Sequence, residues 1–254
     1  GVYTFQGGTD CMIEMMQRDR WGLLDGLRVA INVNDRRYLN MQYNVLPVAR
    51  AKNMAVVGMK IFSDGAMYTK EPRWSRGPED VVRIIGTRAV PRRPLIEYAL
   101  TTPGVHTVII GIGEIHDDPL RCQLVQNYYA AQIEPDSLDH RARREIEAIG
   151  TRARGGQTNY FQLPDRGLTP PRNVTVVKKG DSLMLTWDTA YAGDEPLSHY
   201  ELMRDGEVMA VVDHAPQVSK NPFVYETSLK GTQYSIAAVD SVGRRAVSVA
   251  SGPV

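Results

Sequence analysis

Cysteine is scarce in this sequence, and neither sign of charge is in excess. Only Cys11 and Cys122 occur among 254 residues, each in a predicted helix, so we expect neither a disulfide framework nor a zinc site. The formal net charge of +1 at pH 7 gives no electrostatic reason to expect a nucleic acid or an anionic membrane as a partner. No apolar run approaches the roughly 20 residues that span a bilayer. The hydrophobic content of 43% is nevertheless sufficient for a sizeable core.

The sequence also lacks internal repeats and low-complexity tracts. It begins with the strand-like segment 1–5, without a start methionine or a signal peptide, which we interpret as the abrupt start of a fragment or a processed product. The length of 254 residues accommodates one large domain or two ordinary ones.

Strand and helix patterns alternate four times between residue 1 and about residue 150. The predicted strands cover residues 2–5, 27–33, 54–59 and 106–110. The predicted helices cover residues 11–18, 38–52, 78–85, 94–100, 118–131 and 137–149, with Thr9 or Asp10 capping the first and Ser137 the last. Such alternation is typical of βαβ units and predicts an α/β domain with a parallel sheet over residues 1–150.

The pattern changes after residue 150. Residues 151–168 are rich in Gly, Arg, Gln and Asn without a period and are predicted to be a linker. Seven short alternating strands with turns between them follow, at residues 174–177, 183–187, 199–204, 208–212, 223–226, 233–239 and 246–250. This spacing predicts an all-β sandwich over residues 169–254.

A lone lysine follows the third predicted strand. The apolar run of residues 55–57 stops at Gly58, Lys60 comes two residues later, and Ser63-Asp64-Gly65 then makes a turn. Ligand contacts in α/β proteins lie at the carboxyl ends of the strands, where the connecting loops meet. Lys60 is therefore a candidate ligand contact, and a solvated lysine at a strand end is the alternative.

The second domain resembles fibronectin type III modules of the immunoglobulin-like class. The resemblance rests on Pro170-Pro171 at its start, Leu183-x-Leu185-x-Trp187 in the second strand, the third-strand segment 200–204, and the corner segment 229–239. It implies that Trp187 packs between two sheets and that the Tyr234 hydroxyl bonds to backbone near a corner. Because one fold serves many functions, this resemblance concerns the fold alone.

The first domain resembles the C-terminal half of an aldo-keto reductase barrel. The matching segments occur in the family's order: Gly7-Gly8-Thr9-Asp10, residues 30–36, 45–50 and 57–60, then Tyr98, Pro103-Gly104, residues 108–111 and Asn127. The resemblance implies a partial TIM-type (β/α) barrel of four parallel βα units, the last four of eight.

The resemblance also implies a site for NAD or NADP. Gln6, Gly7 and Asn34 match the positions that hold the nicotinamide carboxamide, and Met59 and Lys60 match those near the ring and the pyrophosphate. The matches in the phosphate and adenine region are Gly111, Gly113 and Asn127. The loop after the fourth strand carries acidic residues, which would repel a 2′-phosphate, so the choice between NAD, NADP and no cofactor stays open.

The resemblance implies an oxidoreductase that transfers a hydride between a nicotinamide and a carbonyl or alcohol. The family's Asp, Tyr, Lys and His proton-transfer group lies on its first four strands, which this sequence does not contain, so the catalytic residues are unknown and the chain alone is expected to be inactive. A full barrel needs roughly 250 residues, and the first and last strands here would be open edges. We therefore expect a missing N-terminal half barrel or a second copy to cover them.

A non-catalytic alternative remains. A degenerate half barrel and a fibronectin-like module would then serve as a scaffold or a surface-binding protein. Modules of the fibronectin type accompany extracellular bacterial enzymes, which favours an exported bacterial protein, although the sequence shows no export signal. A small carbonyl compound is the expected substrate if the protein is an enzyme.

Overall fold

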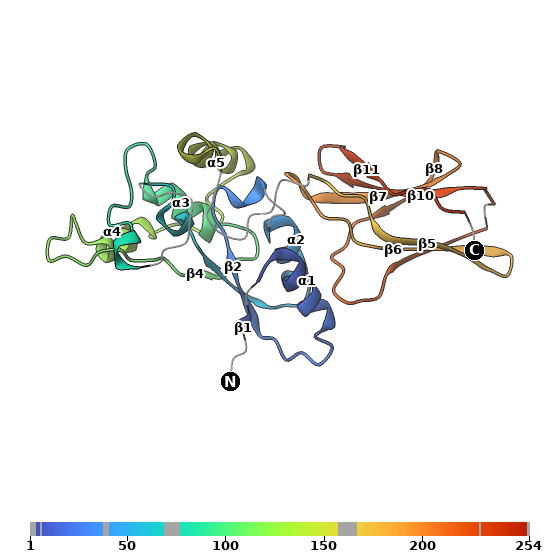
Figure 1. Cartoon of the computed structure of the whole chain (residues 1–254), viewed down its shortest axis with the longest axis horizontal. Helices are drawn as coiled ribbons and strands as arrows, with labels where there is room; N and C mark the ends of the chain where they lie inside the picture. Colours follow the sequence, from blue (N-terminus) through green and yellow to red (C-terminus); the bar gives the residue numbers. More distant parts are fainter. Residues whose placement is uncertain are drawn as a thin grey trace.

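A parallel sheet and two antiparallel sheets make up this protein, as seen in a computed structural model (Figure 1). The structure describes residues 4–5, 7–37, 41–68, 77–156, 167–228 and 230–252. A parallel sheet in the first part and antiparallel sheets in the second confirm the predicted mixture of α/β and all-β structure.

The first part holds four parallel strands in the order β1-β2-β3-β4. These are β1 (Thr4–Phe5), β2 (Gly26–Ala30), β3 (Ala55–Met59) and β4 (Thr107–Val108). The helices between and after them are α1 (Thr9–Arg18), α2 (Met41–Ala51), α3 (Arg92–Leu100), α4 (Gln123–Ala130) and α5 (His140–Arg154). Three short 3₁₀ turns are η1 (Asp35–Arg37), η2 (Ser63–Gly65) and η3 (Pro78–Asp80). Within the described residues β1 pairs only with β2 and β4 only with β3, so both edges of this sheet are open.

Alternation along β2 and β3 places the core on one face of the parallel sheet. Leu27, Val29 and Val56 are fully buried, and they pack in one cluster with apolar residues of α1, α2 and α3. Arg28 in β2 is exposed, and Val57 and Met59 in β3 are only partly buried. The second face of the sheet is therefore the more open one.

The second part consists of two antiparallel sheets, β5-β6-β9 and β11-β10-β7-β8. Its strands are β5 (Arg172–Lys179), β6 (Ser182–Asp188), β7 (Leu197–Arg204), β8 (Glu207–Asp213), β9 (Phe223–Thr227), β10 (Tyr234–Asp240) and β11 (Arg245–Val247). Trp187 is fully buried, as predicted, and its ring centroid lies 5.6 Å from Tyr200 and 5.5 Å from Phe223. Each of the seven predicted strands overlaps one of these seven.

The antiparallel part forms hydrogen bonds and an ion pair with α1, α2 and α5 of the first part. Asn44 of α2 bonds to both backbone groups of Ala192, at 2.8 and 3.1 Å. Gln17 of α1 donates to the backbone oxygen of Gln217 at 2.9 Å, and Arg144 of α5 pairs with Glu195. The antiparallel part is thus fixed against the helices rather than attached by the chain alone.

Several predicted boundaries were wrong, for local reasons. The predicted helix over residues 78–85 is only the turn η3, because Val81, which follows it, is extended and the next two carbonyls, of Val82 and Arg83, accept from Gln123. The helix predicted from residue 118 begins at Gln123, because the side chain of Asp118 accepts from the Leu120 N–H and forms a turn.

The predicted caps were also wrong. Gly8 precedes α1 and makes no side-chain cap, while Asp139 rather than Ser137 caps α5, accepting from the Ala142 N–H at 2.7 Å. Ser137 donates instead to Glu97 at 2.6 Å. Residues 151–154, expected to begin the linker, continue α5 until Gly155 ends it at φ 61°.

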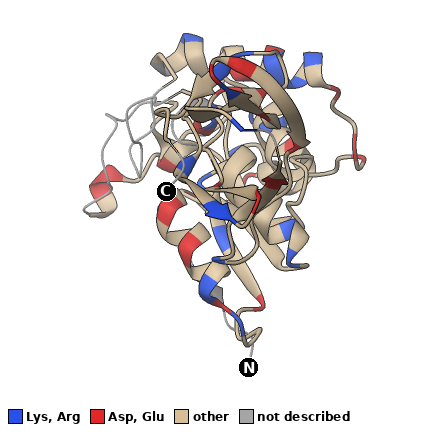
Figure 2. Ribbon diagram, turned by 90° about the vertical axis from the view of Figure 1, so that its right-hand side faces the viewer, with Lys and Arg blue, Asp and Glu red and all other residues tan. Residues whose placement is uncertain are grey.

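Acidic and basic residues are interspersed along the described chain in the view of Figure 2. This distribution is in keeping with a net charge of +1. Within the described residues no helix is long and apolar enough to cross a membrane.

Candidate functional site

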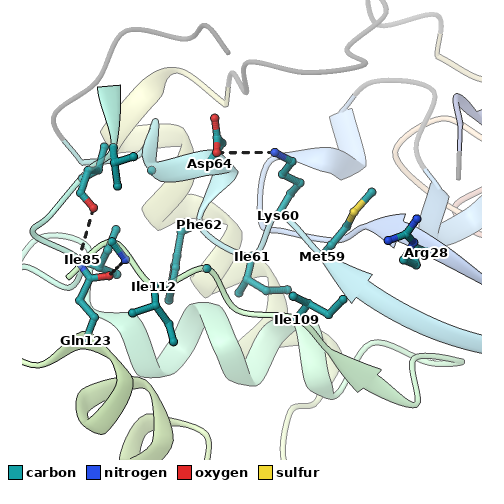
Figure 3. A pocket seen from close by; sticks show the side chains of 15 residues that line it. Arg28, Met59, Lys60, Ile61, Phe62, Asp64, Ile85, Ile109, Ile112 and Gln123 are labelled. Carbon is teal, nitrogen blue, oxygen red and sulfur yellow. Dashed lines mark hydrogen bonds and ion pairs between the residues drawn. The ribbon is translucent and has the colours of Figure 1, made fainter. Parts of the chain in front are cut away.

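A cavity of about 400 Å³ lies where β3 and β4 end (Figure 3). Its wall is largely apolar, with one basic residue from β2 and one just after β3. Its lining residues include Arg28, Met59, Lys60, Ile61, Phe62, Asp64, Val82, Ile109, Gly111, Ile112, Gly113 and Gln123. The carboxyl edge of a parallel sheet is the usual place for a binding site in α/β proteins.

Lys60 occupies a turn that the surrounding structure holds in an unusual conformation. Its φ is 60°, and the next residues with positive φ are Ser63, Asp64 and Gly65. Non-glycine residues in this region cost of the order of 1–3 kcal/mol each, and such conformations cluster at ligand-binding sites. The Lys60 carbonyl accepts from the Asn32 side chain at 3.0 Å and from the Ser63 N–H at 2.8 Å, which stabilises the turn. The Lys60 ammonium lies 3.6 Å from the Asp64 carboxylate.

The opposite wall is formed by the loop after β4. The Gly113 N–H donates to the side chain of Gln123 at 2.6 Å, and Gln123 in turn donates to the backbone oxygen of Arg83. A Cβ at Gly113 would lie 2.2 Å from the backbone oxygen of Val82, so no other residue fits without a shift of the loop. At Gly111 an added Cβ would meet nothing within 4 Å, so its backbone faces open space.

Asn127 supports this loop from behind. It is 4% exposed, its side chain donates to the Gly111 carbonyl at 3.5 Å, and it accepts from Arg92 at 3.2 Å. Partial burial lowers the pKa of Arg92 from its ordinary value. Asn127 therefore acts on the cavity through Gly111 rather than lining it.

The structure brings four of the eight predicted cofactor residues to this cavity: Met59, Lys60, Gly111 and Gly113. Neither Gly7 nor Asn34 is among its lining residues. Asn34 is fully buried, its N–H donates to the side chain of Asn32, and it packs closely against Gly150 of α5. Gln6 lies outside the residues that the structure describes.

Three residues that shape the cavity were not predicted from the sequence: Arg28, Asn32 and Gln123. Arg28 is the one charged residue of the apolar strand β2, and that position was a usable signal. Asn32 and Gln123 act through hydrogen bonds to distant backbone groups, for which the sequence offers no signal.

The cavity offers binding groups rather than an evident proton-transfer group. The acidic and basic side chains along its wall are Arg28, Lys60 and Asp64. Across the described part of the chain, no cluster of three or more His, Cys, Asp or Glu residues could hold a metal ion. The arrangement suits an anionic ligand with an apolar body.

Comparison with known proteins gives only distant likenesses. No family model matches the sequence, and no curated protein matches it. Among solved structures, the aldo-keto reductase AKR11C1 from Bacillus halodurans (holo form) matches with a TM-score of 0.37 and 17% identity, over 57% of this chain and 48% of that one. An engineered protein matches with a TM-score of 0.26 and 11% identity, over 100% of this chain and 54% of that one. The chain thus spans about half the length of each of these two structures.

Proposed function

We propose that the cavity at the ends of β3 and β4 binds a nicotinamide dinucleotide, as part of an oxidoreductase of the aldo-keto reductase type. The observation that carries the proposal is the convergence of two sequence segments. Met59 and Lys60 lie about 50 residues before Gly111 and Gly113 in the chain, the sequence resemblance implies this role for all four, and they line one cavity.

The residues present fit such a ligand in three respects. The Lys60 ammonium offers a charge to a phosphate, and Asp64 orients it. The backbone of Gly111 faces open space, so a phosphate can approach it closely. Met59 and Ile109 provide an apolar surface for a planar ring. A bound nicotinamide would supply the hydride, while this chain would bind and orient it.

The choice between NAD and NADP rests on the loop after β4. Glu114 there lies 3.7 Å from Arg121, so its charge is partly compensated. Asp117 and Asp118 keep the loop acidic, and an acidic loop disfavours a 2′-phosphate. We therefore propose NAD as the preferred form.

The proposed enzyme requires a covering polypeptide. β1 and β4 are open edges within the described sheet, and Ile109 and Ile112 beside β4 are exposed. Open parallel edges pair readily with further strands. We propose that an N-terminal half barrel or a second copy completes the barrel and brings the proton-transfer residues. Light scattering of the purified chain separates the two, because a second copy doubles the mass.

The all-β part fits a fibronectin type III-like role as a docking module, in a protein exported from a bacterium. Its seven strands in two sheets and its buried Trp187 support the fibronectin-like fold, whereas the docking role and the export rest on the sequence resemblance alone. Among the described residues, it contributes none to the lining of the cavity.

Titration with NADH, followed by its fluorescence, tests the proposed function. We expect saturable binding that weakens about tenfold or more in Lys60→Ala, since a charge-assisted bond is lost. Lys178→Ala, which removes an exposed lysine of β5, is the matched control and should bind as the wild type does. An absence of saturable binding, or equal binding by the Lys60 variant, would favour the non-catalytic scaffold.

A further inference from the structure

Arg28 is a charged residue on the open face of an otherwise apolar strand. β2 reads Gly-Leu-Arg-Val-Ala, and the two neighbours of Arg28, Leu27 and Val29, are fully buried on the face covered by helices. Because side chains alternate along a strand, Arg28 points to the opposite face, where it is exposed and lines the cavity. Its register partner in β3 is Val57.

The two basic residues of the cavity differ in their surroundings. Lys60 has Asp64 at 3.6 Å, whereas no carboxylate of the described chain forms an ion pair with Arg28. In Figure 3 the Lys60 side chain extends towards Asp64, and Met59 lies between Lys60 and Arg28. A guanidinium keeps its charge in nearly any environment and offers a planar fork that fits a carboxylate. Arg28 is therefore the stronger of the two sites for an added anion.

The two basic residues lie at separate positions in the cavity. Arg28 lies within β2, opposite Val57 of β3, whereas Lys60 lies in the turn after β3, three residues beyond Val57. In Figure 3 Met59 lies between them, and Ile109 also lines the cavity. A ligand whose anionic group sits at Arg28 would extend an apolar body along Met59.

We infer that Arg28 binds the carboxylate of an apolar carboxylic acid in the part of the cavity nearest β2. The Arg28 fork donates to the two carboxylate oxygens, and the methionine and isoleucine side chains contact the hydrocarbon body. That this acid, with a carbonyl or hydroxyl group in its apolar body as hydride acceptor or donor, is the substrate of the enzyme rests on the function proposed above. The binding position itself rests only on Arg28 and the cavity wall.

A matched pair of probes tests the inference: 4-phenylbutyrate and its neutral analogue 4-phenyl-1-butanol, titrated by calorimetry into the full chain. We expect the wild type to bind the carboxylate about tenfold more tightly than the alcohol. The preference should vanish in Arg28→Gln and persist in part in Arg28→Lys, which retains the charge but not the fork. Arg88→Gln removes an exposed arginine that does not line the cavity, and should match the wild type.

Three results would overturn the inference: no binding of the carboxylate, equal affinity for the two probes, or a preference that survives in Arg28→Gln. A preference lost in Lys60→Ala but kept in Arg28→Gln would place the anion at Lys60 and would also overturn it. NADH titration separates this inference from the proposed function. Failure of NADH binding with an intact, Arg28-dependent preference refutes the cofactor alone, whereas NADH binding without the preference refutes the Arg28 site alone.

Discussion

Replacing Glu147 by alanine should destabilise the α/β part strongly. Glu147 lies on α5, and its side chain is 10% exposed. One carboxylate oxygen accepts from Arg36 and from the Tyr98 hydroxyl, each at 2.8 Å, and the other lies 2.8 Å from Arg36 and 3.1 Å from Arg144. Burial beside this carboxylate raises the pKa of Tyr98, so its hydroxyl remains a donor over the whole useful pH range. Glu147 thus joins α5 to α3 and η1.

The expected loss of stability follows from the charged partners that lose Glu147 while they remain mostly buried. Removing one member of a buried ion pair costs about 3–5 kcal/mol, because the other charge stays buried without compensation. Arg144 keeps its pair with Glu195, Arg36 keeps Asp194 at 3.9 Å, and the two arginine side chains are 24% and 13% exposed, so these carboxylates and water offset part of that penalty. We therefore expect the free energy of unfolding to fall by about 3 kcal/mol in Glu147→Ala.

Urea unfolding followed by far-UV circular dichroism measures this change, because the α-helices of the described chain all end by Arg154. The matched control is Glu145→Ala on the same helix, whose salt bridge with Arg141 joins side chains that are 66% and 89% exposed. Such exposed pairs contribute about 0.5 kcal/mol or less. Equal losses in the two variants would refute the reasoning, since burial would then play no part.

Three further predictions concern a histidine, a tryptophan and a glycine. Burial lowers the pKa of His214 to about 4, below its unfolded value, so the neutral ring stabilises the fold fully above about pH 6.5. The free energy of unfolding in urea should therefore fall by about 2 kcal/mol from pH 7 to pH 5 in the wild type, but not in His214→Gln. In the same assay, Trp187→Ala should lower the free energy of unfolding by about 3–5 kcal/mol, and replacement of the exposed Trp21 by alanine by about 0.5 kcal/mol or less. Similar losses in the two variants would contradict the placement of Trp187 in the core. In thermal unfolding, Gly113→Ala should lose about 1–3 kcal/mol of stability, because the added Cβ collides with backbone, whereas Gly111→Ala should be as stable as the wild type. Wild-type stability in both variants would show that the loop has room for a Cβ at Gly113.

The sequence predicts strands and helices well where burial follows a regular period. β6 alternates between partly buried and buried residues along its whole length, and its predicted range, 183–187, lies inside the observed strand. The segment 81–85 has the apolar content of a helix, yet it forms neither helix nor strand. Its carbonyls are held by Gln123, about 40 residues further along the chain, and no local pattern reports such a contact.

The candidate site likewise contains residues that the sequence marks correctly as cavity-lining and one that it does not. The end of a buried strand marks Met59 and Lys60 in the sequence, and a glycine-rich loop after the next strand marks Gly111 and Gly113. Their role as cofactor contacts stays a prediction. Asn34 has the same sequence signals, but its side chain packs against Gly150 of α5, because the chain turns over residues 32–37 after β2. The direction of that turn depends on tertiary packing.

Three buried amide side chains fix the backbone that surrounds the cavity. Asn32 is 0%, Gln123 2% and Asn127 4% exposed, and they bond to Lys60, Gly113 and Gly111 respectively. A loop that is ordered only on binding reduces affinity by the entropy it loses, so loops held beforehand leave more of the contact energy for the ligand. Both walls of this cavity are held in that manner, one after β3 and the other after β4. The conformation with positive φ at Lys60 is stabilised by the same bonds, so the lysine is presented to a ligand without a further change of the chain.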